Sequence, residues 1–146
     1  MLLGNYFNGI HKNYKKLFFS GISFDTRSLK KENIFFAIKG NNIDGNKFIS
    51  KAIKKGSKII VSEQKIKDFR NGILFIRTKN IRKLLAEVSF KIYNKIPKNL
   101  IAVTGTNGKS SVAEFYLQIM KYNKKKVASI GTLGVKSKNI NLNLFN

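Results

Sequence analysis

Short apolar runs alternate with amphipathic stretches between residue 20 and about residue 95. The runs at 34–38, 58–61 and 73–76 have the length of buried strands, and a shorter strand is expected at 22–24. Two other stretches place apolar residues on one face of a helix. These residues are Phe48, Ile49, Ala52 and Ile53 in the first stretch, and Ile81, Leu84, Leu85, Val88 and Ile92 in the second. The alternation predicts a small α/β domain with a largely buried sheet.

Local signals set the limits of these elements. Asp44 is a plausible N-cap for the first helix, and Gly56 is expected to end it. Pro97 is the single proline and directly follows the second helix, so we expect a seam there. We therefore predict a complete domain at 1–97 and a second unit at 98–146. Residues 17–19, which precede the first expected strand, are apolar and can pack as a first structural element.

The second unit is expected to contain one βαβ crossover. Its parts are a strand at 100–104, a helix that begins near Lys109 and a strand at 127–130. Residues 136–146 are polar, so we expect them to provide no element that completes the unit. Two parallel strands and one helix cannot bury both faces of a sheet, so the unit is expected to be unfinished.

A glycine-containing turn joins the first of these strands to the helix. Glycines allow main-chain N–H groups to approach an anion, and the N-terminus of the helix adds a partial positive charge. Lys109 is expected to neutralise phosphate charge, and the Ser110 hydroxyl to ligate Mg²⁺. The predicted phosphate cradle, a P-loop, consists of Gly105, Thr106, Asn107, Gly108, Lys109, Ser110 and Ser111.

The match to the strict P-loop pattern is partial, because Val103 stands where that pattern has its first glycine. The alternative is an ordinary glycine-rich turn with a solvated lysine. Beyond the cradle the sequence holds one acidic residue, Glu114, which we interpret as solvated or as compensating the helix dipole. A phosphoryl-transfer site needs a further acidic group for Mg²⁺, so the site is expected to be incomplete in this chain.

Composition narrows the classes of function. The 146 residues include no cysteine, which excludes a disulfide framework, a thiol nucleophile and a cysteine zinc site. The net charge of +22 comes almost entirely from scattered lysines, with arginine only at 27, 70, 77 and 82. We interpret this excess as a compositional bias, and nucleic acid is not an expected partner. No run is long enough for a bilayer span and no signal peptide is recognisable, so a cytoplasmic, monomeric protein without membrane contact is expected.

Residues 104–111, followed by 129–134, resemble the ATP-binding segment of the Mur ligase family, which usually reads T-G-T-N-G-K-T-T. The serines at 110 and 111 keep the hydroxyl groups of that segment. In the first domain, residues 23–28 resemble the family's x-x-D-S-R-x, and residues 34–40 its L-F-x-A-x-x-G. Asp44 and Gly45 are similar to the D-G pair that follows.

The resemblance implies a three-domain enzyme that uses ATP and Mg²⁺ to form an amide bond, with Lys109 as a catalytic residue. It is strongest to members that add meso-diaminopimelate or lysine to UDP-N-acetylmuramoyl-L-alanyl-D-glutamate. This chain then looks like the UDP-substrate-binding domain plus the start of the ATP-binding domain, and is expected to be inactive by itself. By resemblance, the residues that bind the UDP-substrate are Phe24, Thr26, Asn41, Asn42 and Ile43.

Two alternatives remain open. From local chemistry alone, the equal alternative is that Asp25 and Arg27 pair across a turn while the asparagines merely shape a loop. At the level of function, the alternative is a non-catalytic module that binds a UDP-sugar or a polyanion. Folylpolyglutamate synthetases share the cradle, but the resemblance at 23–45 argues against them.

Overall fold

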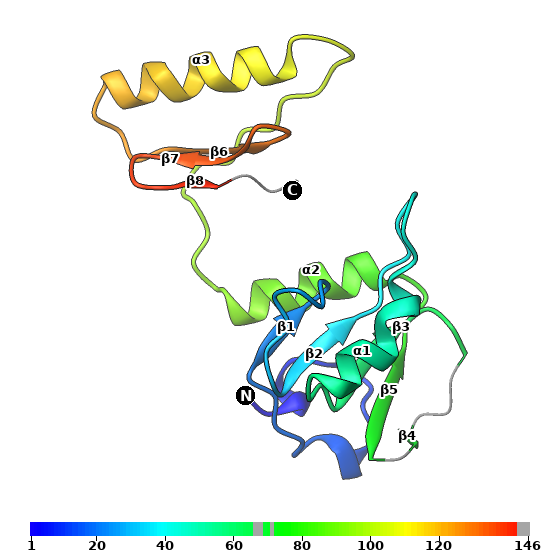
Figure 1. Cartoon of the computed structure of the whole chain (residues 1–146). Helices are drawn as coiled ribbons and strands as arrows, with labels where there is room; N and C mark the ends of the chain where they lie inside the picture. The colour runs from blue at the N-terminus through cyan, green and yellow to red at the C-terminus, as the bar shows by residue number, and fades with distance from the viewer. Residues whose placement is uncertain (66–68, 71, 143–146) are drawn as a thin grey trace. The chain divides into compact units, whose positions relative to one another are not determined.

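The computed structural model describes residues 1–65, 69–70 and 72–142, and Figure 1 shows the elements of the chain. The chain divides into two compact units, Met1–Ile96 and Pro97–Asn146. Within the described ranges, no helix combines the length and the apolar character that a bilayer span requires.

The first unit is built on a five-stranded sheet with the order β1-β2-β3-β5-β4. The first four strands in this order are parallel: β1 (Gly21–Ser23), β2 (Asn33–Phe36), β3 (Ile59–Ser62) and β5 (Ile73–Arg77). They confirm the predicted α/β fold of this region. The edge strand β4 (Phe69–Arg70), which was not predicted, runs antiparallel to β5.

Helices α1 (Ile49–Lys54) and α2 (Ile81–Ile92) form at the predicted places. A 3₁₀ turn, η3 (Gly45–Phe48), precedes α1, and the Asp44 carboxylate caps it by accepting a hydrogen bond of 2.9 Å from the Asn46 N–H. Gly56 follows α1 with φ of 92°, a conformation that favours glycine, and so ends the helix as predicted. The predicted stop at Gly56 is therefore correct, but Asp44 caps the 3₁₀ turn rather than α1, whose N-cap is Phe48.

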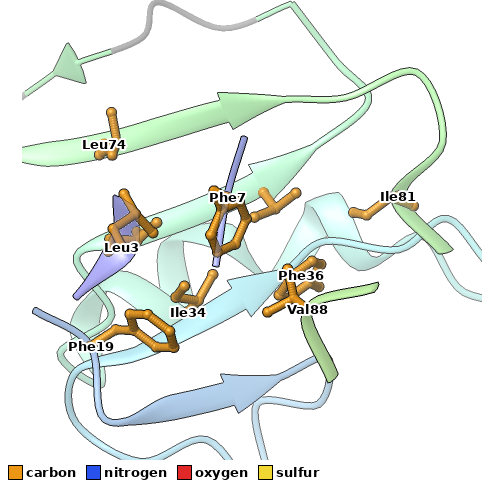
Figure 2. Packing of buried hydrophobic residues seen from close by; sticks show 10 residues of the cluster. Leu3, Phe7, Phe19, Ile34, Phe36, Leu74, Ile81 and Val88 are labelled. Carbon is orange, nitrogen blue, oxygen red and sulfur yellow. The ribbon is translucent and has the colours of Figure 1, made fainter. Parts of the chain in front are cut away.

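Successive side chains of the strands lie on opposite faces of the sheet, and both faces are buried. In β2, Ile34 and Phe36 lie in one core cluster, whereas Phe35 belongs to the cluster on the other face, which also contains Ala52 of α1. This pattern is typical of parallel strands covered on both sides. Figure 2 shows the larger cluster, whose buried members are Leu3, Phe7, Phe19, Ile34, Phe36, Ile59, Val61, Leu74, Ile81 and Val88.

The N-terminal segment completes this larger cluster. It contains the 3₁₀ turns η1 (Leu3–Asn5) and η2 (Lys12–Tyr14). The expectation that residues 17–19 pack is correct for Phe19, which is buried, but Phe18 is exposed. The Phe19 ring meets Tyr6 edge to face at a centroid distance of 5.3 Å.

The second unit differs from the predicted βαβ crossover. Helix α3 (Lys109–Tyr122) forms as expected, and β6 (Ala128–Gly131) lies within one residue of the predicted strand. However, residues 100–104 form no strand, and β6 pairs antiparallel with β7 (Gly134–Ser137). A third strand, β8 (Asn141–Leu142), pairs with β7, so the segment after residue 135 does extend the sheet.

The cost of chain closure favours the β6–β7 hairpin, while the other edge of β6 has no partner strand among the described residues. A parallel partner for β6 requires a long crossover connection, whereas β7 follows β6 after a turn of two residues. Gly134 takes φ of 89° as the chain re-enters the sheet after that turn. The apolar run that was expected as a buried strand is instead solvent-exposed, with Leu100 at 87%.

Candidate functional site

The expected UDP-substrate residues follow β1 and β2, which are parallel neighbours. Their carboxyl ends therefore lie at the same edge of the sheet. Phe24 comes directly after β1, and its side chain is 64% exposed. After β2, residues 38–45 form a tight projecting loop, drawn in cyan in Figure 1. The Gly40 N–H donates to the Ile43 carbonyl at 2.8 Å, which places Asn41 and Asn42 at the tip.

The side chains at this tip are available to a ligand. Asn41, Asn42 and Ile43 are all exposed, and the two asparagine side chains make no hydrogen bond to any described residue. The loop is held by main-chain hydrogen bonds rather than by these amides. The structure therefore brings Phe24 and the loop tip to one edge, with amide donors and acceptors and apolar surface exposed.

Thr26 has a different environment from the other four. It is 5% exposed, and its carbonyl accepts a hydrogen bond of 2.6 Å from the Lys55 ammonium group. On either side of it, Arg27 Nε and Asp25 Oδ2 form an ion pair at 2.8 Å. The N–H of Arg27 also donates to the Asp25 carboxylate, and this bond is the main reason that the Asp25 pKa is lowered. The pairing of Asp25 and Arg27 considered from local chemistry is thus present.

Three further side chains fix the loop after β2, and sequence reasoning gave none of them a role. Arg82 Nη2, from α2, donates to the Lys39 carbonyl at 3.2 Å. Ser62 Oγ, from the end of β3, donates to Asn46 Oδ1 at 2.7 Å, while Asn46 Nδ2 donates to the Asp44 carboxylate. Arg82 and Lys39 lie far apart in the sequence, so no local pattern signals this contact.

Gly45 is required where this loop returns to the sheet. A Cβ atom at this position would lie 2.5 Å from the carbonyl oxygen and 2.7 Å from the nitrogen of Ile38, both main-chain atoms. We expect Gly45→Ala to lower the free energy of unfolding of the first unit by about 1–3 kcal/mol, because the backbone must shift. Urea unfolding followed by circular dichroism measures this change. Asn42→Ala at the exposed tip is the control, and an equal effect in both variants would contradict the explanation.

The predicted phosphate cradle forms an exposed turn before α3. Gly105 and Gly108 have φ of 146° and 75°, so both occupy the region that favours glycine. Gly108 is the N-cap of α3 and provides no capping side chain. Among the described residues, no acceptor is hydrogen-bonded to the main-chain N–H groups from Gly105 to Ser111. These donors and the helix N-terminus are suited to an anion.

Lys109 and Ser110 are both positioned by neighbouring groups. The Lys109 ammonium group donates to the carbonyl of Gly105 and, at 3.1 Å, to that of Thr106, which holds the charge beside the loop. Ser110 Oγ lies 3.2 Å from Oγ1 of Thr132, in the turn between β6 and β7. Thr132 belongs to the segment that carries the family resemblance, but sequence reasoning assigned it no role.

Glu114 is paired, rather than simply solvated. Its carboxylate accepts a hydrogen bond of 3.0 Å from Lys136 of β7, and this contact is the main reason that its pKa is lowered. No group of three His, Cys, Asp or Glu side chains suited to a metal ion occurs in the part of the chain described. A Mg²⁺ ion at the cradle would therefore have the Ser110 hydroxyl, phosphate oxygens and water as its ligands, a set that Mg²⁺ accepts.

Comparison with known proteins identifies the family. Residues 19–98 match the Mur ligase family, catalytic domain. The UDP-N-acetylmuramoyl-L-alanyl-D-glutamate–2,6-diaminopimelate ligase of Rickettsia prowazekii (strain Madrid E) is 40% identical over 128 residues, 88% of this chain and 26% of that protein. The enzyme of the same name from Clostridium tetani (strain Massachusetts / E88) is 43% identical over 77% of the chain and 24% of that protein.

Solved structures agree on the fold. A UDP-N-acetylmuramoyl-L-alanyl-D-glutamate–2,6-diaminopimelate ligase superimposes with a TM-score of 0.72 over 96% of this chain and 29% of its own, at 21% identity. The MurF ligase from Thermotoga maritima in complex with ADP gives a TM-score of 0.56 at 24% identity, over 72% of this chain and 24% of its own.

The extent of these matches is informative. The likeness to the Rickettsia prowazekii ligase spans more residues than the first unit contains, so it extends into the second unit, which holds the cradle. The chain spans about a quarter of the length of these curated relatives. From the family match and the identity shared across both units, the chain belongs to the Mur ligase family.

Proposed function

We propose that the chain supplies the UDP-substrate-binding domain and the phosphate-binding loop of an ATP-dependent ligase of peptidoglycan precursor synthesis. The reaction adds meso-diaminopimelate or lysine to UDP-N-acetylmuramoyl-L-alanyl-D-glutamate, and the names of the relatives favour diaminopimelate. The observation that carries the proposal is the turn before α3. Its N–H groups from Gly105 to Ser111 are not engaged by any residue that the structure describes, and the Lys109 ammonium group is held beside them.

In this reaction the γ-phosphoryl group of ATP passes to a carboxylate of the UDP-substrate. The amino group of the incoming amino acid then attacks the acyl phosphate, so that an amide bond forms and ADP and phosphate leave. Lys109 neutralises charge on the phosphates, and the N–H groups of the cradle hold them in position. Bound Mg²⁺, with the Ser110 hydroxyl as a ligand, would supply further charge neutralisation.

The edge of the sheet in the first unit provides the second binding surface. Phe24 and Ile43 expose apolar side chains that can flank a uracil base, and Asn41 and Asn42 offer amide groups to the polar parts of the ligand. Thr26 contributes mainly by fixing the turn after β1, because it is buried there.

The chain by itself is expected to bind without turnover. Glu114 is the only acidic residue after the cradle, and it is engaged by Lys136. No carboxylate is therefore left in this part of the chain to complete the Mg²⁺ site that phosphoryl transfer requires.

Calorimetry on the 146-residue chain tests this proposal. Separate titrations use UDP-N-acetylmuramoyl-L-alanyl-D-glutamate, ATP with Mg²⁺, and a random-sequence RNA. We expect one saturable site for each of the first two ligands and no release of ADP when both are present. Binding of RNA without either ligand would instead indicate a polyanion-binding module. Binding of the UDP-substrate without ATP would indicate a sugar-binding module and contradict the nucleotide site.

A further inference from the structure

Among the described residues, two polar side-chain contacts join helix α3 to the β6–β7 hairpin. Ser110 Oγ lies 3.2 Å from Thr132 Oγ1, and the Glu114 carboxylate lies 3.0 Å from the Lys136 ammonium group. Ser110 and Glu114 are one helical turn apart, so they share one face of α3. In Figure 1 the turn between β6 and β7 lies at the same end of the unit as the start of α3. The hairpin is thus attached to the segment that contains the cradle.

From this arrangement we infer that Thr132 is a positioning residue for the nucleotide site, acting through Ser110, and that the Glu114–Lys136 ion pair holds the hairpin that presents it. The inference rests on the proposed function, because it concerns the same cradle. Nothing in the sequence resemblance gives Thr132, Glu114 or Lys136 a task.

The chemistry of a hydroxyl ligand explains why Thr132 is needed. When the Ser110 oxygen binds a cation, its lone pairs are directed to the metal, and its proton becomes a stronger hydrogen-bond donor that needs an acceptor. Thr132 Oγ1 is within reach of that proton. A hydrogen bond from Ser110 to Thr132 therefore orients the Ser110 oxygen toward the cation. The effect of Thr132 should then be greatest when Mg²⁺ is present.

Lys136 maintains this geometry from the adjoining strand. In the register of the hairpin, Lys136 is opposite Ser129 and Gly134 is opposite Gly131, so Thr132 lies in a turn of two residues. Such a short turn leaves Thr132 little freedom once its strands are fixed. The side chains of Lys136 and Glu114 are each about 30% exposed, at 29% and 31%, so the pair is partly shielded from water.

A double-mutant cycle on the full 146-residue chain tests the inference. ATP affinity is measured by calorimetry for wild type, Thr132→Val, Ser110→Ala and the double variant, each with Mg²⁺ and with EDTA. We expect Thr132→Val to weaken binding about tenfold with Mg²⁺, and less than about twofold with EDTA. In the Ser110→Ala background, Thr132→Val should change ATP affinity by less than about twofold, because the Ser110 hydroxyl that Thr132 positions is absent. Thr132→Ser retains the hydroxyl group, so its affinity for ATP with Mg²⁺ should equal that of wild type.

Two matched lysine variants test the role of the ion pair. Lys136→Met should weaken Mg²⁺-ATP binding about threefold by loosening the hairpin, whereas Lys138→Met, which removes the same charge from an exposed site, should not. Thermal unfolding shows whether each variant remains folded. If Thr132→Val does not fold, the inference is tested by the ATP affinity of Thr132→Ser and by the comparison of Lys136→Met with Lys138→Met.

Failure of the proposed function and failure of this inference give different results. A wild-type chain that does not bind ATP overturns the proposed function together with this inference. If wild type binds ATP and Thr132→Val binds it with the same affinity, only the inference is overturned. The same conclusion follows if Thr132→Val weakens binding equally in the Ser110→Ala background or in EDTA, since its role would then be only structural.

Discussion

Replacing Phe36 by alanine should lower the free energy of unfolding of the first unit by about 3–5 kcal/mol. Phe36 is 0% exposed and lies in the larger core cluster, where its ring stacks on Phe7 at a centroid distance of 6.5 Å. The truncation removes buried apolar area and leaves a cavity that the strands of a fixed sheet cannot fill. Because small domains are stable by only about 5–15 kcal/mol, this loss removes a large part of the stability of the unit and should lower its urea midpoint accordingly.

Urea unfolding of the full chain, followed by far-ultraviolet circular dichroism, measures this loss. Phe24→Ala is the matched control, because the same ring is removed from an exposed position just beyond β1. We expect that control to change the free energy of unfolding by less than about 0.5 kcal/mol. A similar value for Phe36→Ala would mean that the cluster in Figure 2 does not carry the stability of the unit.

Lys109→Met should weaken the binding of ATP to the chain by about ten- to a hundredfold. The substitution keeps the length of the side chain but removes the only cation that the structure holds against the Gly105 and Thr106 carbonyls in the described cradle. The phosphates then lose a charged donor at the start of α3, where the N–H groups alone must hold them.

Calorimetry with ATP and Mg²⁺ measures this effect, and Lys126→Met is the control. Lys126 is an exposed lysine beyond the end of α3, so its loss changes the net charge equally without altering the cradle. Affinity for UDP-N-acetylmuramoyl-L-alanyl-D-glutamate should be unchanged in both variants. Equal weakening by the two substitutions would show that general charge, rather than the cradle, attracts the nucleotide.

The first unit shows which parts of a fold can be predicted from local pattern. The runs at 34–38 and 58–61 became β2 and β3 because both faces of a parallel sheet are covered, and such strands are apolar throughout. Gly56 ends α1 as predicted, because a left-handed residue works through its immediate neighbours, whereas Asp44 caps the 3₁₀ turn before α1 rather than α1 itself. The packing of Leu3 was not foreseeable, since the N-terminal segment has neither the period of a helix nor that of a strand.

The second unit shows the limit of the same reasoning. The apolar run at 100–103 satisfies the pattern of a buried strand, yet a strand forms only where another strand pairs with it. In the described chain, β6 finds its partner in β7 instead. Gly134, whose φ of 89° follows the turn of this hairpin, lies in the stretch that resembles the ATP-binding segment, and that resemblance does not indicate a hairpin.

The residues of the candidate sites could be proposed from the sequence, whereas the contacts that hold them in place could not. Lys109 and Asn41 follow from motif and resemblance, and where they lie is consistent with the proposed roles. Arg82 and Thr132 were missed because each acts through a contact between segments far apart in the sequence. Such contacts depend on the register of strands and helices, which the order of apolar residues does not specify.

The two carbonyl contacts of Lys109 have a consequence for the energetics of the proposed nucleotide site. An ammonium group has three N–H donors, and the Gly105 and Thr106 carbonyls engage two of them, which leaves the third for an incoming oxygen. A free lysine loses about 1.5–2 kcal/mol of rotamer entropy when it is ordered. Here the ordering accompanies folding, so the proposed cradle is preorganised, and more of its contact energy with a phosphate should appear as affinity.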